Sequence, residues 1–188
     1  MDSDEASDED LVRRFACGEA VAFEALYRRY ELRVFRYLLR TLRDRALAED
    51  ALQDIWFAVA REAGRFEPVS RFSAWLFRIA HNRMIDAVRA ARREVSLEVV
   101  VADAEVQGTA LGHAPDPHAA AVASEKLDAV LTALAQLPAE QRQAFLMQQE
   151  GGLSVEEIAT VAACPIETAK SRLRYAREKL RELLRGSR

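Results

Sequence analysis

Cysteine, proline and glycine are all scarce in this chain of 188 residues, which contains two, five and seven of them respectively. The two cysteines, Cys17 and Cys164, lie far apart and show no metal-ligand spacing. A structural disulfide or a zinc site is therefore not expected, and a reducing compartment fits. So few glycines and prolines favour long helices and exclude a β-sandwich or a β-barrel.

Long apolar runs are also absent from the sequence. No stretch of about 18 apolar residues occurs, so we expect no membrane insertion. The first ten residues, MDSDEASDED, lack the basic and apolar segments of a signal peptide. These absences predict a cytoplasmic protein. The formal net charge of −3 argues against a protein that coats nucleic acid without specificity.

The remaining pattern predicts an all-α fold with two helical domains joined by a flexible acidic linker. Apolar residues recur at three- and four-residue spacing through residues 11–93 and again through 124–188, after a frayed acidic tail at 1–10. Gly18-Glu19 should break the first stretch into a short helix and a long one, and Gly151-Gly152 should end a helix with a left-handed glycine cap. The linker, residues 94–123, contains carboxylates but no lysine or arginine, and its glycines and prolines exclude a continuous helix. His113 and His118 lie in it without further ligands, so we expect no metal site.

Residues 153–185 predict two helices joined by a tight turn. Ser154 and Glu157 have the spacing of a capping box, and Pro165 ends the first helix near Ala163. The second helix, from about Glu167, has an opposite basic face and one apolar stripe of five residues, namely Ala169, Leu173, Ala176, Leu180 and Leu184. Eight basic residues and three acidic ones occur from Glu167 to the C-terminus. This local positive charge favours a helix-turn-helix that enters a DNA groove over an ordinary helical hairpin with a solvated charged face.

Two helices of the first domain carry candidate binding residues. Residues 46–61 place Asp50, Gln53, Asp54 and Trp56 close together, and nothing nearby supplies a nucleophile or a metal-binding histidine. We interpret this group, with an exposed tryptophan, as either a solvated face or a docking surface for a basic protein. Residues 72–93 interleave aromatic residues with arginines and an asparagine, a pattern that suits single-stranded DNA, although burial is the more usual state of Trp75.

Four segments in this order resemble the extracytoplasmic function (ECF) sigma factors, the group IV sigma factors of bacterial RNA polymerase. The segments are AEDALQDIWF, FSAWLFRIAHNRMID, LPAEQRQAF and ETAKSRLRYAREKLR. The resemblance implies a non-enzymatic transcription initiation factor without a cofactor or a small-molecule substrate. Its implied partners are core RNA polymerase, through the β′ clamp helices and the β flap, promoter DNA and an anti-sigma factor. The linker would lie in the RNA exit region.

The same resemblance implies a role for individual residues. The core polymerase contacts would be Asp50, Gln53, Asp54 and Trp56. The promoter −10 element would be melted and bound by the loop at residues 64–70 and by Arg78, Asn82, Arg83, Asp86 and Arg89. The −35 element would be bound by Arg142, Thr168, Lys170, Ser171, Arg172, Arg174, Tyr175 and Arg177.

Two other functions remain open from the residues alone. A helix-turn-helix regulator that acts without core polymerase would need a sensor site in the first domain, and it would leave the acidic helix without a purpose. A recombinase or nuclease would need a cluster of metal-binding carboxylates or a nucleophilic serine, which we do not find in the sequence.

Overall fold

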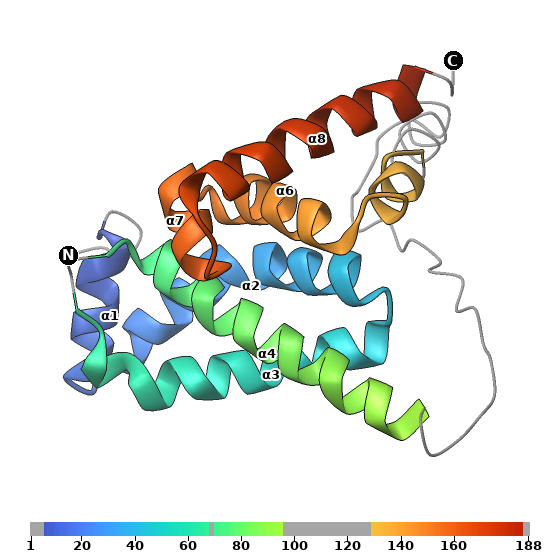
Figure 1. Ribbon diagram of the computed structural model, residues 1–188. Helices are drawn as coiled ribbons and strands as arrows, with labels where there is room; N and C mark the ends of the chain where they lie inside the picture. Colours follow the sequence, from blue (N-terminus) through green and yellow to red (C-terminus); the bar gives the residue numbers. More distant parts are fainter. Residues whose placement is uncertain (1–5, 68–69, 96–128, 186–188) are drawn as a thin grey trace, which may run out of the picture.

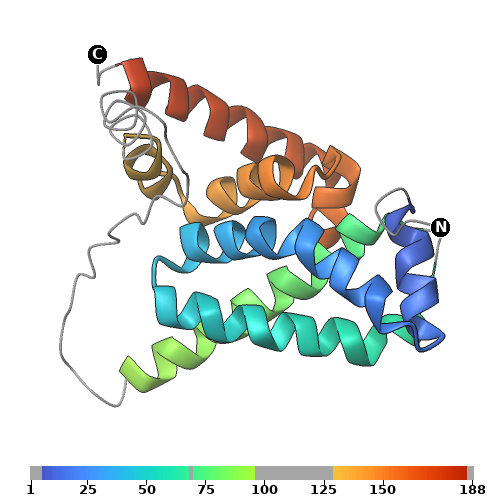
Figure 2. The same ribbon diagram turned by 180° about the vertical axis from the view of Figure 1, so that it is seen from behind.

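The computed structural model describes residues 6–67, 70–95 and 129–185, with only the backbone described for residues 92–95. Every regular element within these ranges is a helix (Figures 1 and 2), as the sequence predicts. The predicted linker at 94–123 lies outside the described residues, except that its first two residues end helix α4. We call residues 6–95 the N-terminal domain and residues 129–185 the C-terminal domain.

The N-terminal domain consists of α1 (Asp8–Ala16), α2 (Ala20–Leu42), α3 (Arg45–Glu62), the short 3₁₀ helix η1 (Ala63–Arg65) and α4 (Phe72–Val95). Helices α2, α3 and α4 run alongside one another, and α1 crosses them at one end (Figure 1). The predicted break between the first two helices is confirmed at Gly18, whose φ of 97° is a conformation that glycine adopts without a steric cost. The core is aliphatic and aromatic, with buried Leu26, Leu38, Ile55, Phe72 and Leu76.

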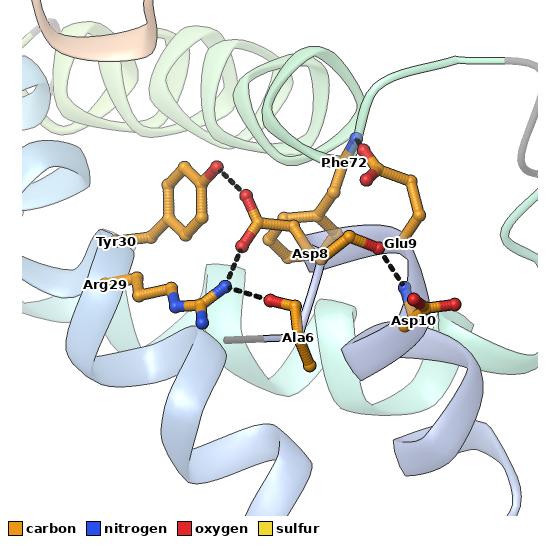
Figure 3. Close-up of polar contacts among 8 residues, drawn as sticks. Ala6, Asp8, Glu9, Asp10, Arg29, Tyr30 and Phe72 are labelled. Carbon is orange, nitrogen blue, oxygen red and sulfur yellow. Dashed lines mark hydrogen bonds and ion pairs between the residues drawn. The ribbon is translucent and has the colours of Figure 1, made fainter. Parts of the chain in front are cut away.

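The acidic segment before Leu11 forms the start of α1, so the expectation of a frayed tail through Asp10 is wrong for its last residues. Ser7 caps α1 by accepting a hydrogen bond from the Asp10 amide at 3.1 Å. Asp8 accepts a hydrogen bond from Arg29 at 2.7 Å and another from the Tyr30 hydroxyl. Figure 3 shows these groups converging between α1 and α2. The carboxylates therefore fasten α1 to the domain.

The C-terminal domain consists of a helical stretch at residues 129–135, followed by α6 (Ala139–Gly151), α7 (Val155–Val161) and α8 (Ile166–Arg185). The predicted capping box is confirmed: the Ser154 hydroxyl accepts from the Glu157 amide at 3.2 Å, and the Glu157 carboxylate accepts from the Ser154 amide at 2.7 Å. Gly152, with φ of 63°, ends α6 in the left-handed conformation that the Gly-Gly pair predicts.

The two domains lie in direct contact through α2 and α4 of the first and α6 and α7 of the second (Figures 1 and 2). Their buried apolar residues form one continuous cluster. The contact is tight at Gly151, because a Cβ atom there would come within 3.2 Å of the Phe77 ring. The sequence pattern predicts two domains but no specific contact between them.

Candidate nucleic-acid and protein interfaces

Helix α8 presents a basic outer face. Its buried stripe is Ala169, Leu173, Ala176 and Leu180, which are four of the five residues that the sequence pattern predicts. Lys170, Arg174, Tyr175 and Arg177 are exposed, and Thr168 and Ser171 are half-buried beside them. Lys170 lies 2.8 Å from Glu167, and this hydrogen bond raises the pKa of its ammonium group. The face therefore stays positive at neutral pH.

An open hollow of 310 Å³ lies against this face of α8. Its lining combines apolar side chains with a row of cations, namely Val155, Lys170, Leu173, Arg174, Arg177, Glu178 and Arg181. The guanidinium carbon of Arg174 lies 4.8 Å from the centre of the Tyr175 ring, a cation–π contact between two exposed side chains. A polyanion that approached α8 would meet four basic side chains in succession.

Three of the arginines predicted to bind the −35 element form hydrogen bonds or ion pairs with other segments of the C-terminal domain. Arg172 forms an ion pair with Glu140, and Arg177 donates a hydrogen bond to Gln148. Arg142 is half-buried and donates to the carbonyl oxygens of Ala135 and Leu137, both at 3.4 Å. Burial lowers the pKa of the Arg142 guanidinium, and nearby Arg43 lowers it further. In this arrangement Arg142 therefore stabilises the turn before α6 and is not aimed at solvent.

Helix α4 carries the residues predicted for the −10 element on one exposed stripe. Arg78, Asn82, Asp86 and Arg89 recur at intervals of four, four and three residues and are all exposed or half-buried, with half-buried Arg83 beside them. Trp75 is buried against Phe66 and Phe72, so it belongs to the core and is not a stacking platform in this structure. The stripe therefore offers arginine and amide groups to a ligand, without an exposed aromatic ring among the side chains that the structure describes on α4.

Helix α3 places Asp50, Gln53 and Asp54 on its exposed face. The expected exposure of Trp56 is wrong: its ring is only 6% exposed and packs 4.9 Å from Tyr27 and 5.6 Å from Phe23, measured between ring centres. The exposed aromatic is the neighbouring Phe57, at 72%. Phe57 was not among the predicted contact residues, although it follows Asp50, Gln53 and Asp54 at the i+7, i+4 and i+3 spacing of one helix face.

His81 lies at the contact between the domains and is buried. Its Nδ1 atom lies 3.0 Å from the hydroxyl of Tyr37, which is also buried. Burial lowers the pKa of the His81 imidazole, and the charge of Arg172 from the C-terminal domain lowers it further. His81 is therefore neutral at pH 7 and is enclosed by protein, not directed at a ligand.

No group of three or more histidine, cysteine, aspartate or glutamate side chains that could hold a metal ion occurs within the part of the chain that the structure describes. Among these same residues, no helix has the length and apolar character needed to cross a membrane. The exposed features are thus an acidic face on α3 and two positively charged faces on α4 and α8. These features suit binding to macromolecules.

Comparisons with known proteins match both domains. The family profile "Sigma-70 region 2" matches residues 26–94, and "Sigma-70, region 4" matches residues 127–180. The chain is 38% identical over 173 residues to the RNA polymerase sigma factor CarQ of Myxococcus xanthus, covering 92% of this chain and 95% of CarQ. It is 34% identical over 180 residues to the RNA polymerase sigma-H factor of Pseudomonas aeruginosa, covering 94% and 93%. It is also 34% identical over 184 residues to the ECF RNA polymerase sigma factor SigM of Mycobacterium tuberculosis, covering 96% and 86%.

Solved structures share the fold. The sigma factor RpoE of Bartonella quintana, solved in complex with the anti-sigma factor NepR, superposes with a TM-score of 0.66 at 29% identity, covering 82% of this chain and 91% of that one. CnrH, solved in complex with the cytosolic domain of CnrY, gives a TM-score of 0.66 at 24% identity and covers 100% of both chains.

Proposed function

The chain belongs to the ECF sigma factor family of bacterial RNA polymerase, and from this premise we propose which of its surfaces perform each task. It is an alternative sigma factor that binds core polymerase and directs promoter-specific initiation of transcription. A helix-turn-helix regulator that acts without polymerase is set aside, because both sigma-70 regions occur in one chain. The family acts in transcription initiation, so the acidic helix needs no catalytic role.

The exposed face of α3 is our candidate for the contact with the β′ clamp helices. Asp50 and Asp54 supply negative charge that complements a basic partner, and Gln53 lies between them. Phe57, one turn further, supplies the apolar contact that such an interface needs at its centre. Trp56, which sequence analysis placed in the contact, supports the helix from beneath through Phe23 and Tyr27.

The exposed stripe of α4 is our candidate for binding the −10 element. Arginines at positions 78 and 89 suit the phosphates of a separated strand, while Asn82 and Asp86 offer hydrogen bonds to the edges of unpaired bases. Arg83 lies beside them. Residues 64–67 and 70 of the preceding loop adjoin the start of α4, where a base turned out of the duplex would be held.

The basic face of α8 is our candidate for reading the −35 element in the major groove. Lys170, Arg174 and Tyr175 are exposed enough to reach base edges, and Thr168 and Ser171 lie near the start of the helix. Arg172 and Arg177 suit phosphates once their present partners, Glu140 and Gln148, are exchanged for DNA. Arg142 contributes to phosphate binding only if the turn before α6 rearranges.

An anti-sigma factor and the β flap complete the proposed partners. The similarity to RpoE, whose structure includes its anti-sigma factor NepR, supports the first of these. Our proposal places the protein in the cytoplasm with the polymerase, and it assigns no metal ion or cofactor to the chain.

Run-off transcription with purified core polymerase tests this function. A library of genomic fragments is transcribed with and without the protein. We expect new transcripts that begin at a fixed distance from a shared two-part sequence. An absence of both new transcripts and co-migration with core polymerase would contradict the proposal and return attention to a regulator that acts alone.

A further inference from the structure

Three arginines of the N-terminal domain bind acceptors at the α6–α7 turn and in the first turn of α7. Arg33 Nε donates to the Glu150 carbonyl oxygen at 2.6 Å, and Arg40 forms an ion pair with the Glu150 carboxylate. Arg71 donates to the Gly152 carbonyl oxygen at 3.2 Å and to the Glu157 carboxylate at 3.3 Å. The three side chains come from α2 and from the residue just before α4, so they form one cationic surface.

Glu150 is the central acceptor on this surface. It is only 8% exposed, which is unusual for a carboxylate, and it is the last residue but one of α6. A buried carboxylate needs a cationic partner, and Arg40 is 110 residues away in the sequence. Near the C-terminus of α6 the unpaired carbonyl groups add further negative potential. The turn therefore resembles a polyanion in charge and in hydrogen-bond acceptors.

The arginine surface approaches the start of the proposed −10 stripe through Arg71, the residue before α4. Phe77 and Met84 of α4 face the C-terminal domain, through Gly151 and Gln143 respectively. Arg78 follows Phe77 by one residue, which places it about 100° further around the helix. Asn82, Asp86 and Arg89 lie about 140°, 180° and 120° from Phe77, so only the Arg78 end of the stripe lies near the contact between the domains. Arg71 precedes Arg78 by seven residues, about two turns, so a strand that continued past Arg78 toward the start of α4 would reach Arg71.

We propose that Arg33, Arg40 and Arg71 form a second phosphate-binding surface, which the α6–α7 turn occupies in this structure and the DNA backbone occupies when the two domains separate. Glu150 and the carbonyl groups beside it hold the positions that phosphate oxygens take in the open protein. The C-terminal domain and DNA therefore compete for the same guanidinium groups. This inference rests on the proposed function, because it extends the −10 surface, but its test does not need the polymerase.

The test measures binding of the free full-length chain to a fluorescein-labelled duplex of random sequence over a series of salt concentrations. Glu150→Lys places a cation against Arg33 and Arg40 and opens the contact, which small-angle X-ray scattering detects as a larger radius of gyration. We expect this variant to bind the duplex more tightly than the wild type. Phosphate contacts carry no sequence information, so a random duplex is an adequate probe.

Adding Arg33→Gln, Arg40→Gln and Arg71→Gln to Glu150→Lys separates phosphate binding from simple opening. If the arginines bind phosphates, the slope of log affinity against log salt concentration falls by about 0.9 for each phosphate that is no longer neutralised. If the turn only holds the two domains together, the combined variant is as open as Glu150→Lys alone and binds the duplex as tightly. That result would overturn the proposal. The proposal would also be overturned if the combined variant bound DNA as tightly as Glu150→Lys alone but bound an acidic protein more weakly.

Arg28→Gln in the Glu150→Lys background is the matched control for Arg71→Gln in the same background, because each removes one exposed guanidinium group. Arg28 is exposed on the same helix and lies about 140° around the helix from Arg33, with its Nε bonded to the Glu24 carbonyl oxygen. An equal fall in slope in this control would mean that net charge alone is responsible, and the proposal would fail. If the combined variant does not fold, Arg71→Gln alone keeps the test decisive, because its side chain is 59% exposed.

A compact Glu150→Lys variant with unchanged DNA binding would also contradict the role of Glu150. A failed run-off assay, by contrast, leaves this experiment intact because it contains no polymerase. If the duplex-binding experiment overturns the arginine surface but the protein still supports run-off transcription, only the second phosphate-binding surface is rejected. The sigma factor assignment then stays in place.

Discussion

Helix α4 in the N-terminal domain and helix α7 in the C-terminal domain begin in different ways. The N-terminus of α7 is capped locally by a capping box, in which Ser154 and Glu157 are only three residues apart. The Phe72 amide at the start of α4 donates to the Glu9 carboxylate at 2.9 Å, across 63 residues of sequence (Figure 3). The start of α7 is thus organised locally, and the start of α4 depends on a distant segment.

The difference shows where each domain gains its order. The α7–α8 unit needs only residues close together in the sequence to fix its turn. The start of α4 is fixed by α1, which is itself attached to α2 through Asp8, Arg29 and Tyr30. Changes in α1 should therefore disturb the proposed −10 surface, although α1 carries none of its residues.

The largest effect on stability should come from Asp8→Ala. This change removes the acceptor shared by Arg29 and Tyr30 and should lower the free energy of unfolding by about 2–3 kcal/mol, since both bonds involve a charged group. Urea unfolding monitored by circular dichroism measures it. Asp10→Ala is the control: its ion pair with Arg13 is exposed, so we expect a loss below about 1 kcal/mol. Equal losses would remove the special role of Asp8.

Glu9→Ala should have the next largest effect. It leaves the Phe72 amide without its acceptor and should cost about 1–2 kcal/mol, which is the range of a lost helix cap. Hydrogen exchange should then show faster exchange at the start of α4 as well as in α1. Faster exchange restricted to α1 would mean that Glu9 does not stabilise α4.

Ser154→Ala should cost about 1 kcal/mol. Because the capping box is local, the faster hydrogen exchange should be confined to α7 and the turns beside it. Faster exchange in α4, in contrast, would show that the two domains unfold as one unit and would break the comparison.

The smallest expected effect concerns pH. Burial, and then the charge of Arg172, lowers the pKa of His81 from its ordinary 6.5. The unfolded chain therefore binds the proton more tightly, and the stability that neutral His81 contributes is present above pH 6.5 and is lost as the pH falls towards the lower folded value. Urea unfolding at about pH 7.5 and about pH 5.5, on either side of the ordinary histidine pKa, should show this loss. His81→Gln should reduce the difference; an unchanged difference would assign it to other groups.

Local signals carried most of what the sequence predicted correctly. The capping box at Ser154, the left-handed end at Gly152, the break at Gly18 and the buried stripe of α8 each depend on residues within a turn or two. The acidic face of α3 was predicted because helical spacing determines which residues share a face, whereas the α4 residues were implied by the resemblance to the ECF sigma factors.

Contacts across the fold could not be predicted in this way. Whether Trp56 or Phe57 is buried depends on how α3 meets Phe23 and Tyr27 of α2, and two adjacent aromatic residues give no periodic signal that decides it. The same limit applies to two further pairs. Glu9 and Phe72 are 63 residues apart in the sequence, and Arg40 and Glu150 are 110 residues apart.

Assembly with core polymerase is the measurement that tests the central claim most directly. Wild-type protein, Asp50→Lys/Asp54→Lys and the control Asp10→Lys/Glu24→Lys are each mixed with core polymerase, and the complex is measured by size-exclusion chromatography. The control makes the same change of charge on exposed carboxylates of α1 and α2. We expect the wild type and the control to form a stoichiometric complex and the α3 variant, although folded, to form none. A stoichiometric complex of the folded α3 variant, or none with the wild type, would contradict the account.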